Sequence, residues 1–200
     1  MDEPTTRDAF TGPSFSLTNR FVRVIWNIVA AIFFRCSPRP CHAWRASLLR
    51  LFGARIGRGA RIYAGASVWA PWNLEVGDES VIADGVIVYS QGKITVGRRS
   101  VISQGTHICS GTHDYTDPGF PLITRPIVIG DHVWVAAEAF IHPGVTIHDG
   151  VVVSARSVVL KDLPEWHVCS GFPCVPLKTR ERTNFNNPNN PNAQPHAAST

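Results

Sequence analysis

The sequence predicts an all-β fold, a parallel β-helix, that carries an N-terminal helical segment and ends in a disordered tail. The main observation is an aliphatic residue that returns at every sixth position of a long stretch. Six is no multiple of the helical period and is not plain alternation, whereas six-residue repeats are typical of a β-helix with three short strands in each coil. An ordinary β-sandwich would instead show alternation and antiparallel turn signals. The repeated positions are Ile56, Ile62, Val68, Leu74, Val76, Ile82, Val88, Ile94, Val96, Ile102, Ile108, Ile129, Val135, Ile141, Ile147, Val153 and Val159.

Two further observations concern the corners of the coils. The phase slips by two residues at Leu74/Val76 and at Ile94/Val96, where we expect a slightly enlarged corner at the end of a coil. A glycine follows the aliphatic residue at four places, and we expect it at corners because glycine tolerates the positive φ of a tight turn. These glycines are Gly57, Gly77, Gly97 and Gly130.

Composition limits the class of protein. The chain has 200 residues, of which 17% are charged and 44% apolar, as in a globular domain with appendages. The net charge of +4 and the pI near 9.0 favour anionic partners, but a nucleic-acid binder would also need aromatic and basic residues interleaved. Five cysteines without a CxxC pair argue against a disulfide scaffold or zinc ribbon and favour reduced thiols in the cytoplasm.

The residues before the repeat predict an arm followed by two helices. Residues 1–18 are polar, lack the apolar core of a signal peptide, and are expected to be a flexible arm. We expect a first helix over residues 19–34, capped by Thr18 or Asn19 and ended by Pro38 and Pro40, and a second over 42–52. Six arginines surround the apolar residues of this segment, residues 19–53. It is either a cap over the open end of the β-helix or a membrane-surface segment, and the two roles can coexist.

The repeat runs from Ile56 to Val159 within a β-helix domain expected over residues 54–180, and it breaks once, between Ile108 and Ile127. Long loops in compact domains are usually functional. His113 lies in this loop beside Asp114, Tyr115 and Asp117, and histidine is the usual general base at neutral pH. We therefore predict His113 as the catalytic base. Residues 181–200 are rich in Asn, Pro and Ala and are expected to be disordered.

Metal chemistry is an alternative, because the same fold occurs in zinc-dependent hydratases. The histidine pairs to consider are His107 with His113 and His142 with His148. A metal site requires three convergent ligands with their own hydrogen-bond partners, and we predict none here. A GxSxG elbow and a GxxxxGK[ST] loop do not occur in the sequence.

The motifs resemble those of the hexapeptide-repeat acyltransferases. The repeats, the His113 loop and the closing Gly171-Phe172-Pro173-Cys174 carry this resemblance. It is closer still to the colanic acid biosynthesis acetyltransferase group, and covers about residues 15–180. The stretches that carry it are Asn19-Arg20-Phe21, Trp26-Asn27, Arg39-Pro40, His42-Ala43-Trp44-Arg45, Thr112-His113-Asp114-Tyr115 and Pro118.

This resemblance implies a left-handed β-helix, a homotrimer with active sites between subunits, and acetyl-CoA as donor for O-acetylation of a sugar or glycan in exopolysaccharide assembly. It places a pantetheine groove along small residues of the late coils and phosphate contacts near the C-terminus. The implied donor-binding residues are Trp134, Ala136, Ala137, Ser154, Ala155, Leu160, Lys161, Lys178 and Arg180. Relatives often have glycine where Ala136 and Ser154 stand, and larger side chains narrow the groove.

The acceptor side is less defined. Asp84 and Tyr89 lie about one coil before the His113 loop and are, with Asp114, candidates to contact sugar hydroxyls. A non-catalytic β-helix scaffold is the remaining rival, and it predicts that replacing His113 changes nothing. The expected location is the cytoplasm, with peripheral contact at the inner membrane face.

Overall fold

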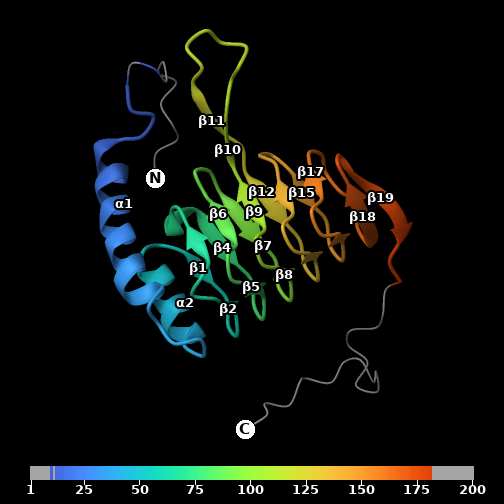
Figure 1. Ribbon diagram of the computed structural model, residues 1–200, viewed down its shortest axis with the longest axis horizontal. Helices are drawn as coiled ribbons and strands as arrows, with labels where there is room; N and C mark the ends of the chain where they lie inside the picture. The colour runs from blue at the N-terminus through green and yellow to red at the C-terminus, as the bar shows by residue number, and fades with distance from the viewer. Residues whose placement is uncertain (1–9, 11, 182–200) are drawn as a thin grey trace.

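The computed structural model describes residues 10 and 12–181, and most of them form a parallel β-helix (Figure 1). Three parallel sheets form its sides, and the chain visits them in turn through five complete coils. Sheet A contains β1 (Arg55–Ile56), β4 (Leu74–Val76), β7 (Ile94–Val96), β12 (Ile127–Ile129) and β15 (Thr146–Ile147). Sheet B contains β2 (Arg61–Ile62), β5 (Val81–Ile82), β8 (Val101–Ile102), β13 (Trp134–Val135), β16 (Val152–Val153), β18 (His167–Gly171) and β19 (Cys174–Thr179). Sheet C contains β3 (Ser67–Val68), β6 (Ile87–Tyr89), β9 (His107–Cys109), β14 (Phe140–Ile141) and β17 (Val158–Val159).

The aliphatic repeat lines one shaft, as the sequence predicts. Every repeated position is buried, and the most exposed of them, Ile56, is 7% exposed. The two phase slips occur where Leu74 and Val76, and Ile94 and Val96, share one three-residue strand with both side chains inward. The corner before β4 contains a short 3₁₀ helix, η2 (Pro71–Asn73). The first two coils each repeat after 20 residues, as in the pairings of Arg55 with Glu75 and of Glu75 with Thr95.

The expected reason for the four corner glycines is wrong. None of Gly57, Gly77, Gly97 and Gly130 has a positive φ, and the left-handed residue of each corner comes two positions later. Those positions hold Gly59, Glu79, Arg99 and His132. Glycine is required instead because the next coil approaches closely: a Cβ on Gly77 would lie 2.6 Å from the backbone N of Arg98.

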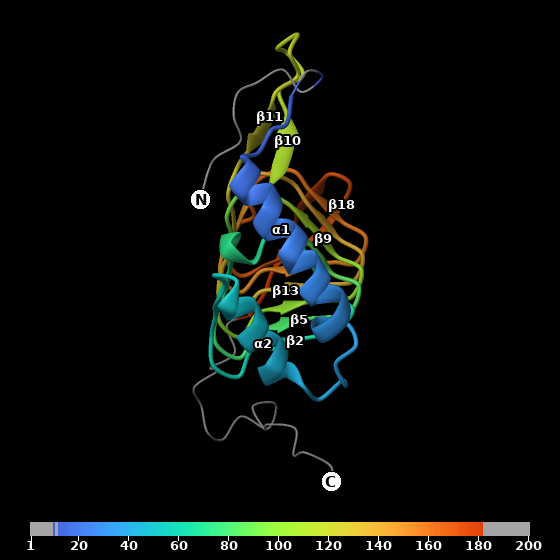
Figure 2. The same cartoon turned by 90° about the vertical axis from the view of Figure 1, so that its left-hand side faces the viewer.

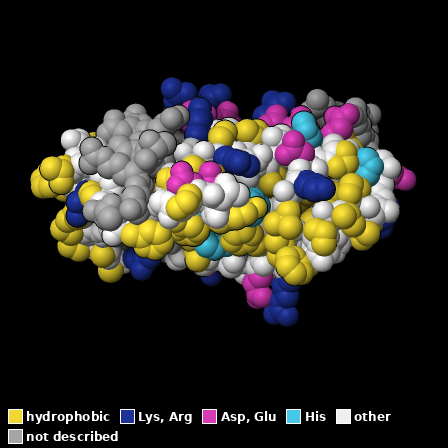
Figure 3. All heavy atoms as spheres, turned by 90° about the horizontal axis from the view of Figure 1, so that it is seen from above, with side chains coloured by type: hydrophobic (Ala, Val, Ile, Leu, Met, Phe, Trp, Pro, Cys, Tyr) yellow, Lys and Arg dark blue, Asp and Glu magenta, His cyan; other side chains and the backbone are white. Residues whose placement is uncertain are grey.

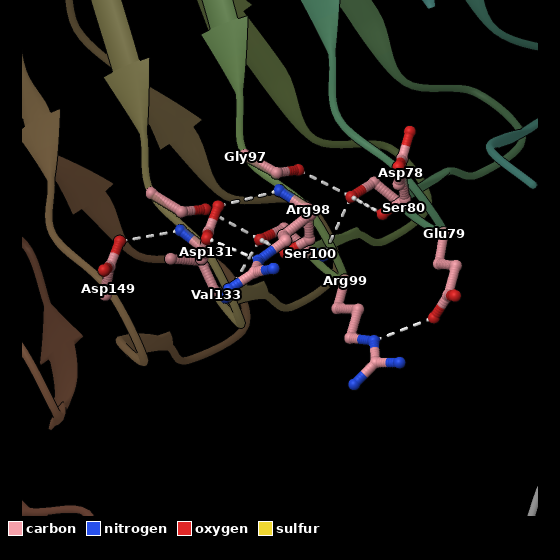
Figure 4. Close-up of polar contacts among 11 residues, drawn as sticks. Asp78, Glu79, Ser80, Gly97, Arg98, Arg99, Ser100, Asp131, Val133 and Asp149 are labelled. Carbon is pink, nitrogen blue, oxygen red and sulfur yellow. Dashed lines mark hydrogen bonds and ion pairs between the residues drawn. The ribbon is translucent and has the colours of Figure 1, made fainter. Parts of the chain in front are cut away.

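Side-chain oxygens connect consecutive coils at these corners (Figure 4). Asp131 Oδ1 accepts from the Arg98 N–H at 2.9 Å, and Asp149 Oδ1 accepts from the Asp131 N–H at 2.8 Å. Inside the corner, the fully buried Ser100 donates to Gly130 O at 2.7 Å and accepts from the Val133 N–H at 3.0 Å. These bonds satisfy backbone groups that the turn removes from the strand ladder.

Two helices precede the first coil. Helix α1 (Leu17–Val29) begins two residues earlier than expected, because the Ser16 hydroxyl accepts from the Asn19 N–H at 3.2 Å and caps it. A π-helical segment, η1 (Ala30–Phe34), continues it to the predicted end, and α2 (His42–Leu51) follows. The end of the predicted flexible arm is thus ordered, since Phe15 also packs on Trp69 with ring centroids 5.0 Å apart.

These helices cover the open edge of the β-helix (Figure 2). Inside the solenoid, the carbonyl of each inward residue accepts an N–H from the preceding coil, as Val76 O does from Gly57. The first coil has no predecessor, and side chains of the helices replace it. Arg50 donates to Ile56 O, Arg45 donates to Ile62 O at 2.6 Å, and Trp26 Nε1 donates to Val68 O at 2.7 Å. One backbone carbonyl in each strand of the first coil therefore has a hydrogen-bond donor.

Arg45 has a second role in this cap. Its side chain is fully buried, and its guanidinium also donates to Ser37 Oγ and to the carbonyl oxygens of Pro38 and Arg39. Burial lowers the pKa of this guanidinium. The contacts fix the connection between η1 and α2 on the first coil.

The opposite end is closed by an antiparallel pair, β18 and β19, after the last full coil. All five cysteines are free thiols. Cys169 and Cys174 are buried in this last coil, and burial raises the pKa of Cys169 to about 11.

Candidate active site

The break in the repeat is a β-hairpin that projects from the side of the solenoid (Figure 1). Its strands, β10 (Gly111–His113) and β11 (Leu122–Thr124), pair antiparallel, and the Arg125 N–H donates to Ser110 O at 2.9 Å at the base. At the tip, the Asp114 carboxylate accepts from the Thr116 N–H and hydroxyl, which lowers the pKa of Asp114. His113 is the last residue of β10, so the hairpin presents it outside the coils.

The hairpin fixes the His113 ring in one orientation. His113 Nδ1 lies 2.8 Å from Phe120 O, and the two rings stack with centroids 4.4 Å apart at an angle of 8°. Phe120 adopts a positive φ of 45°, which turns its carbonyl back toward β10. A carbonyl oxygen only accepts, so Nδ1 carries the proton and the neutral ring keeps its lone pair on Nε2. This is the tautomer that a general base requires.

A cavity of about 330 Å³ lies against His113. The hairpin contributes His113 and Leu122, the β6–β7 corner contributes Gln91, and the remaining wall comes from α1 and the segment that leads into it. That wall consists of Pro13, Ser14, Phe15, Arg20 and Arg23. The cavity thus joins the predicted base to wall residues that lie 90 to 100 positions earlier in the chain.

Of the three predicted acceptor-binding residues, only one lies next to this cavity. Tyr89 lies next to this cavity, because Gln91 Nε2 donates to its hydroxyl at 3.3 Å. Asp84 accepts from the Gly65 N–H at 2.9 Å at a corner of the coils and does not line the cavity. Asp114 is held in the tip turn and does not line it either.

A second cavity, of about 450 Å³, lies at the corner between sheets B and C. Five predicted donor-binding residues line it together: Trp134, Ala136, Ala137, Ser154 and Ala155. The indole of Trp134 is held by a hydrogen bond from Nε1 to Ser103 Oγ at 3.0 Å. The wall is mostly apolar and made of small side chains, which suits a slender, flexible chain such as pantetheine. We call this cavity the small-residue groove.

Leu160, Lys161, Lys178 and Arg180 do not line the small-residue groove. Lys161 follows β17 at another corner, and Lys178 is exposed on β19. Arg180 Nη1 donates to His132 O at 3.0 Å and to Gly150 O at 2.9 Å, and burial lowers the pKa of its guanidinium. These bonds tie the last strand to two corners of the solenoid.

Several residues of the two cavities were not predicted. The small-residue groove is also lined by Ser103, Gln104 and Val152. The six-residue register could have identified them, since each aligns with a predicted groove residue one coil away. Arg20, Arg23 and Gln91 stand beside His113. The two arginines are three residues apart, so they lie on one face of a helix. Their position beside the hairpin depends on how the N-terminal segment packs on the solenoid, which the spacing does not reveal.

The histidine pairs considered for a metal do not converge. Within the described part of the chain, no group of three or more His, Cys, Asp or Glu side chains could hold a metal ion. His107 lies on β9 between the rings of Tyr89 and Phe140, and burial lowers its pKa. His148 is exposed on a corner of another coil.

A solenoid of six-residue repeats with a histidine-bearing hairpin and a small-residue groove defines a hexapeptide-type transferase. The family model for bacterial transferase hexapeptide (six repeats) matches residues 126–161. The Escherichia coli (strain K12) protein WcaF, assigned as a colanic acid biosynthesis acetyltransferase, is 45% identical over 159 residues, covering 80% of this chain and 87% of WcaF. The chain therefore belongs to the hexapeptide-repeat acetyltransferases, near the colanic acid biosynthesis group.

Solved structures agree with this assignment. A maltose O-acetyltransferase from Clostridium difficile 630 has a TM-score of 0.76 at 26% identity, over 83% of this chain and 90% of that one. A hexapeptide-repeat acetyltransferase from Vibrio cholerae O1 biovar eltor, solved with acetyl coenzyme A, has a TM-score of 0.76 at 25% identity. That match covers 84% of this chain and 92% of the other.

Proposed function

We propose that this protein moves an acetyl group from acetyl-CoA to a sugar hydroxyl in the assembly of an exopolysaccharide or related glycan. The family supports the reaction and the donor, and the relative named for colanic acid biosynthesis supports the pathway class. The observation that carries the proposal is the imidazole of His113, oriented by Phe120 O with Nε2 free for a substrate proton.

In the proposed mechanism, His113 Nε2 takes the proton of the acceptor hydroxyl as its oxygen attacks the thioester carbonyl carbon. The C–O bond forms, and a tetrahedral oxyanion results, which a backbone N–H would stabilise. Collapse of this intermediate breaks the C–S bond, and the imidazolium returns its proton to the leaving sulfur of CoA. Holding the two substrates side by side supplies a large part of the rate.

The donor would lie in the small-residue groove, with Trp134 as one wall and Ala136, Ala137, Ser154 and Ala155 along the pantetheine. Lys161, Lys178 and Leu160 remain candidates for the nucleotide end. Arg180 is a weaker candidate for a phosphate, because its Nη1 already donates to two carbonyl oxygens.

We further propose a homotrimer with active sites between subunits. The hairpin leaves sheet C at the ends of its strands, whereas the small-residue groove lies where the chain enters sheet C. The two cavities share no residue and stand a strand length apart, roughly 10 Å for three residues. A neighbouring copy would bring its groove to this His113.

We also propose a cytoplasmic enzyme whose N-terminal helix touches the inner membrane face. Over the described residues, one helix, Leu17–Phe34, is long and apolar enough to cross a membrane by length and composition alone, and 17% of it is buried. Its exposed apolar residues include Phe21, Val24 and Ile28, and hydrophobic side chains are visible at the left end of the molecule, where α1 lies (Figure 3). No acidic residue occurs between Asp8 and Glu75, while nine arginines do, and this charge suits anionic lipid headgroups.

The central test is acetyl transfer by variants of two histidines. Labelled acetyl-CoA is incubated with nucleotide sugars and lipid-linked glycans, and the acetylated product is identified. We expect His113→Ala to lower turnover by at least about 10²-fold, the usual effect of removing a general base. His148→Ala is the matched control, because His148 is exposed on a corner and lines neither cavity. The absence of transfer by both wild type and His113→Ala would favour the scaffold alternative, and equal transfer by both would rule out His113 as the base.

A further inference from the structure

Two arginines share the His113 cavity without a carboxylate partner. Arg20 and Arg23 lie three positions apart on α1, so both side chains project from the same helix face. Among the described residues, no acidic side chain pairs with either guanidinium, and the cavity wall contains no acidic residue. The cavity therefore carries two positive charges beside the predicted base and no built-in anion.

Arg23 is held in place by aromatic rings. Its guanidinium lies 4.2 Å from the ring centroid of Trp69 and 5.8 Å from that of Phe15. Burial, and to a lesser degree the charge of Arg20, lowers the pKa of Arg23. A guanidinium stacked on rings keeps its N–H groups at its edges, where a bidentate oxyanion binds. Packing thus orients a charged group that no described residue neutralises.

We propose that the acceptor carries an oxyanion, a phosphate or a carboxylate, which Arg20 and Arg23 bind while its hydroxyl faces His113. This inference rests on the proposed acetyl transfer and narrows its acceptor to an anionic glycan. Gln91 supplies a neutral polar group in the same cavity for a sugar hydroxyl. The anion is either part of the sugar, as in a uronate, or part of its carrier, as in a glycosyl phosphate.

The proposed membrane contact of α1 suggests one particular carrier, a lipid-linked diphosphate. The exposed apolar residues Phe21, Val24, Ile25 and Ile28 belong to the same helix as the two arginines. A polyprenyl diphosphate sugar would place its lipid beside these residues and its diphosphate in the cavity. A nucleotide sugar offers the same diphosphate without the lipid, so the two sources can be separated.

The test compares one sugar in four forms: neutral methyl glycoside, uronate, nucleoside diphosphate sugar and polyprenyl diphosphate sugar. We expect kcat/KM for the preferred anionic form to exceed that of the neutral form by at least about tenfold, in keeping with hydrogen bonds to a charged group. Which form is preferred identifies the source of the anion. Equal kcat/KM for all four forms would overturn the proposal.

Variants assign the effect to the two arginines. Arg20→Gln and Arg23→Gln should each lower kcat/KM for the anionic form by about tenfold and leave the neutral form within about twofold. Arg58→Gln is the matched control, since Arg58 is exposed and lines neither cavity. Arg20 is exposed as well, so its variant avoids the packing that Arg23 makes with Trp69. A rise in KM for acetyl-CoA instead would assign the arginines to the donor and sink the idea.

A direct binding measurement tests the anion site independently of acetyl transfer. If no form is acetylated, inorganic pyrophosphate is titrated into wild type, the double variant of Arg20 and Arg23, and Arg58→Gln. Binding that is present in wild type and in Arg58→Gln but lost in the double variant supports the anion site even where acetyl transfer fails. The absence of binding to wild type counts against it.

Discussion

At the scale of single residues, the hydrogen bonding of backbone groups explains which residues occupy the corners better than backbone conformation does. Ser100 joins three coils, because it accepts from the backbone N–H of Val133, donates to Gly130 O and itself donates a backbone N–H to Ser80 Oγ. Ser80 repeats the pattern one coil earlier by donating to Gly97 O at 2.6 Å. A short column of two buried hydroxyls therefore satisfies N–H and C=O groups of three consecutive coils at this corner.

We expect Ser100→Ala to destabilise the protein by about 1–3 kcal/mol, because a buried N–H and a buried carbonyl lose their partner. Denaturant unfolding monitored by circular dichroism measures the change. Ser47→Ala is the control, since Ser47 is exposed and bonds only within α2. A loss no larger than that of the control would show that the hydroxyl column contributes little.

At the scale of elements, the small-residue groove depends on side chains that stop at Cβ. Ala155 is exposed at the lip of the groove, so a larger side chain there fills the cavity without disturbing the core. We expect Ala155→Trp to raise KM for acetyl-CoA by at least about tenfold, a change of about 1.4 kcal/mol. Steady-state kinetics at saturating acceptor measure it, with Ala43→Trp on the exposed face of α2 as control. An unchanged KM would place the donor elsewhere.

Helix α1 has two faces with separate roles. Trp26 is buried against the first coil, whereas Phe21 and Ile28 are exposed, as is Ile32 in the following η1 segment. We expect wild type to float with vesicles of phosphatidylglycerol and phosphatidylcholine, and Phe21→Ser with Ile28→Ser to reduce the bound fraction by about tenfold. Leu177→Ser, an exposed apolar residue on β19, is the control. Wild type that stays in solution would disprove the membrane contact.

At the scale of the whole molecule, the proposed trimer can be tested because the two cavities share no residue. Subunits with His113→Ala keep an intact groove, and subunits with Ala155→Trp keep an intact base. If sites form between subunits, random mixed trimers made of equal parts should regain about one quarter of wild-type activity. Activity of the two pure variants and of their mixture, after joint refolding or co-expression, measures this. A mixture no better than its components would place each site within one chain.

Most of the fold could be predicted from the sequence because one physical requirement, an aliphatic side chain in the shaft every sixth residue, recurs in every coil. His113 stands out in the sequence because it departs from that repeat, whereas the five groove residues were implied by the resemblance to the hexapeptide-repeat acyltransferases. Their roles in catalysis and donor binding stay predictions. The close approach at Gly77 could not be predicted, because it depends on the spacing between coils. Arg20 and Arg23 could not be placed, because their cavity forms only when Phe15 packs on Trp69 and brings α1 to the hairpin.

The donors that Arg50, Arg45 and Trp26 present to the first coil have a consequence for association. They occupy the same carbonyl oxygens that a further parallel strand would use. A chain lacking its N-terminal helices would offer an unprotected edge to the C-terminal end of another molecule. Stacking of that kind has no closure, so we expect a chain without these three donors to form filaments.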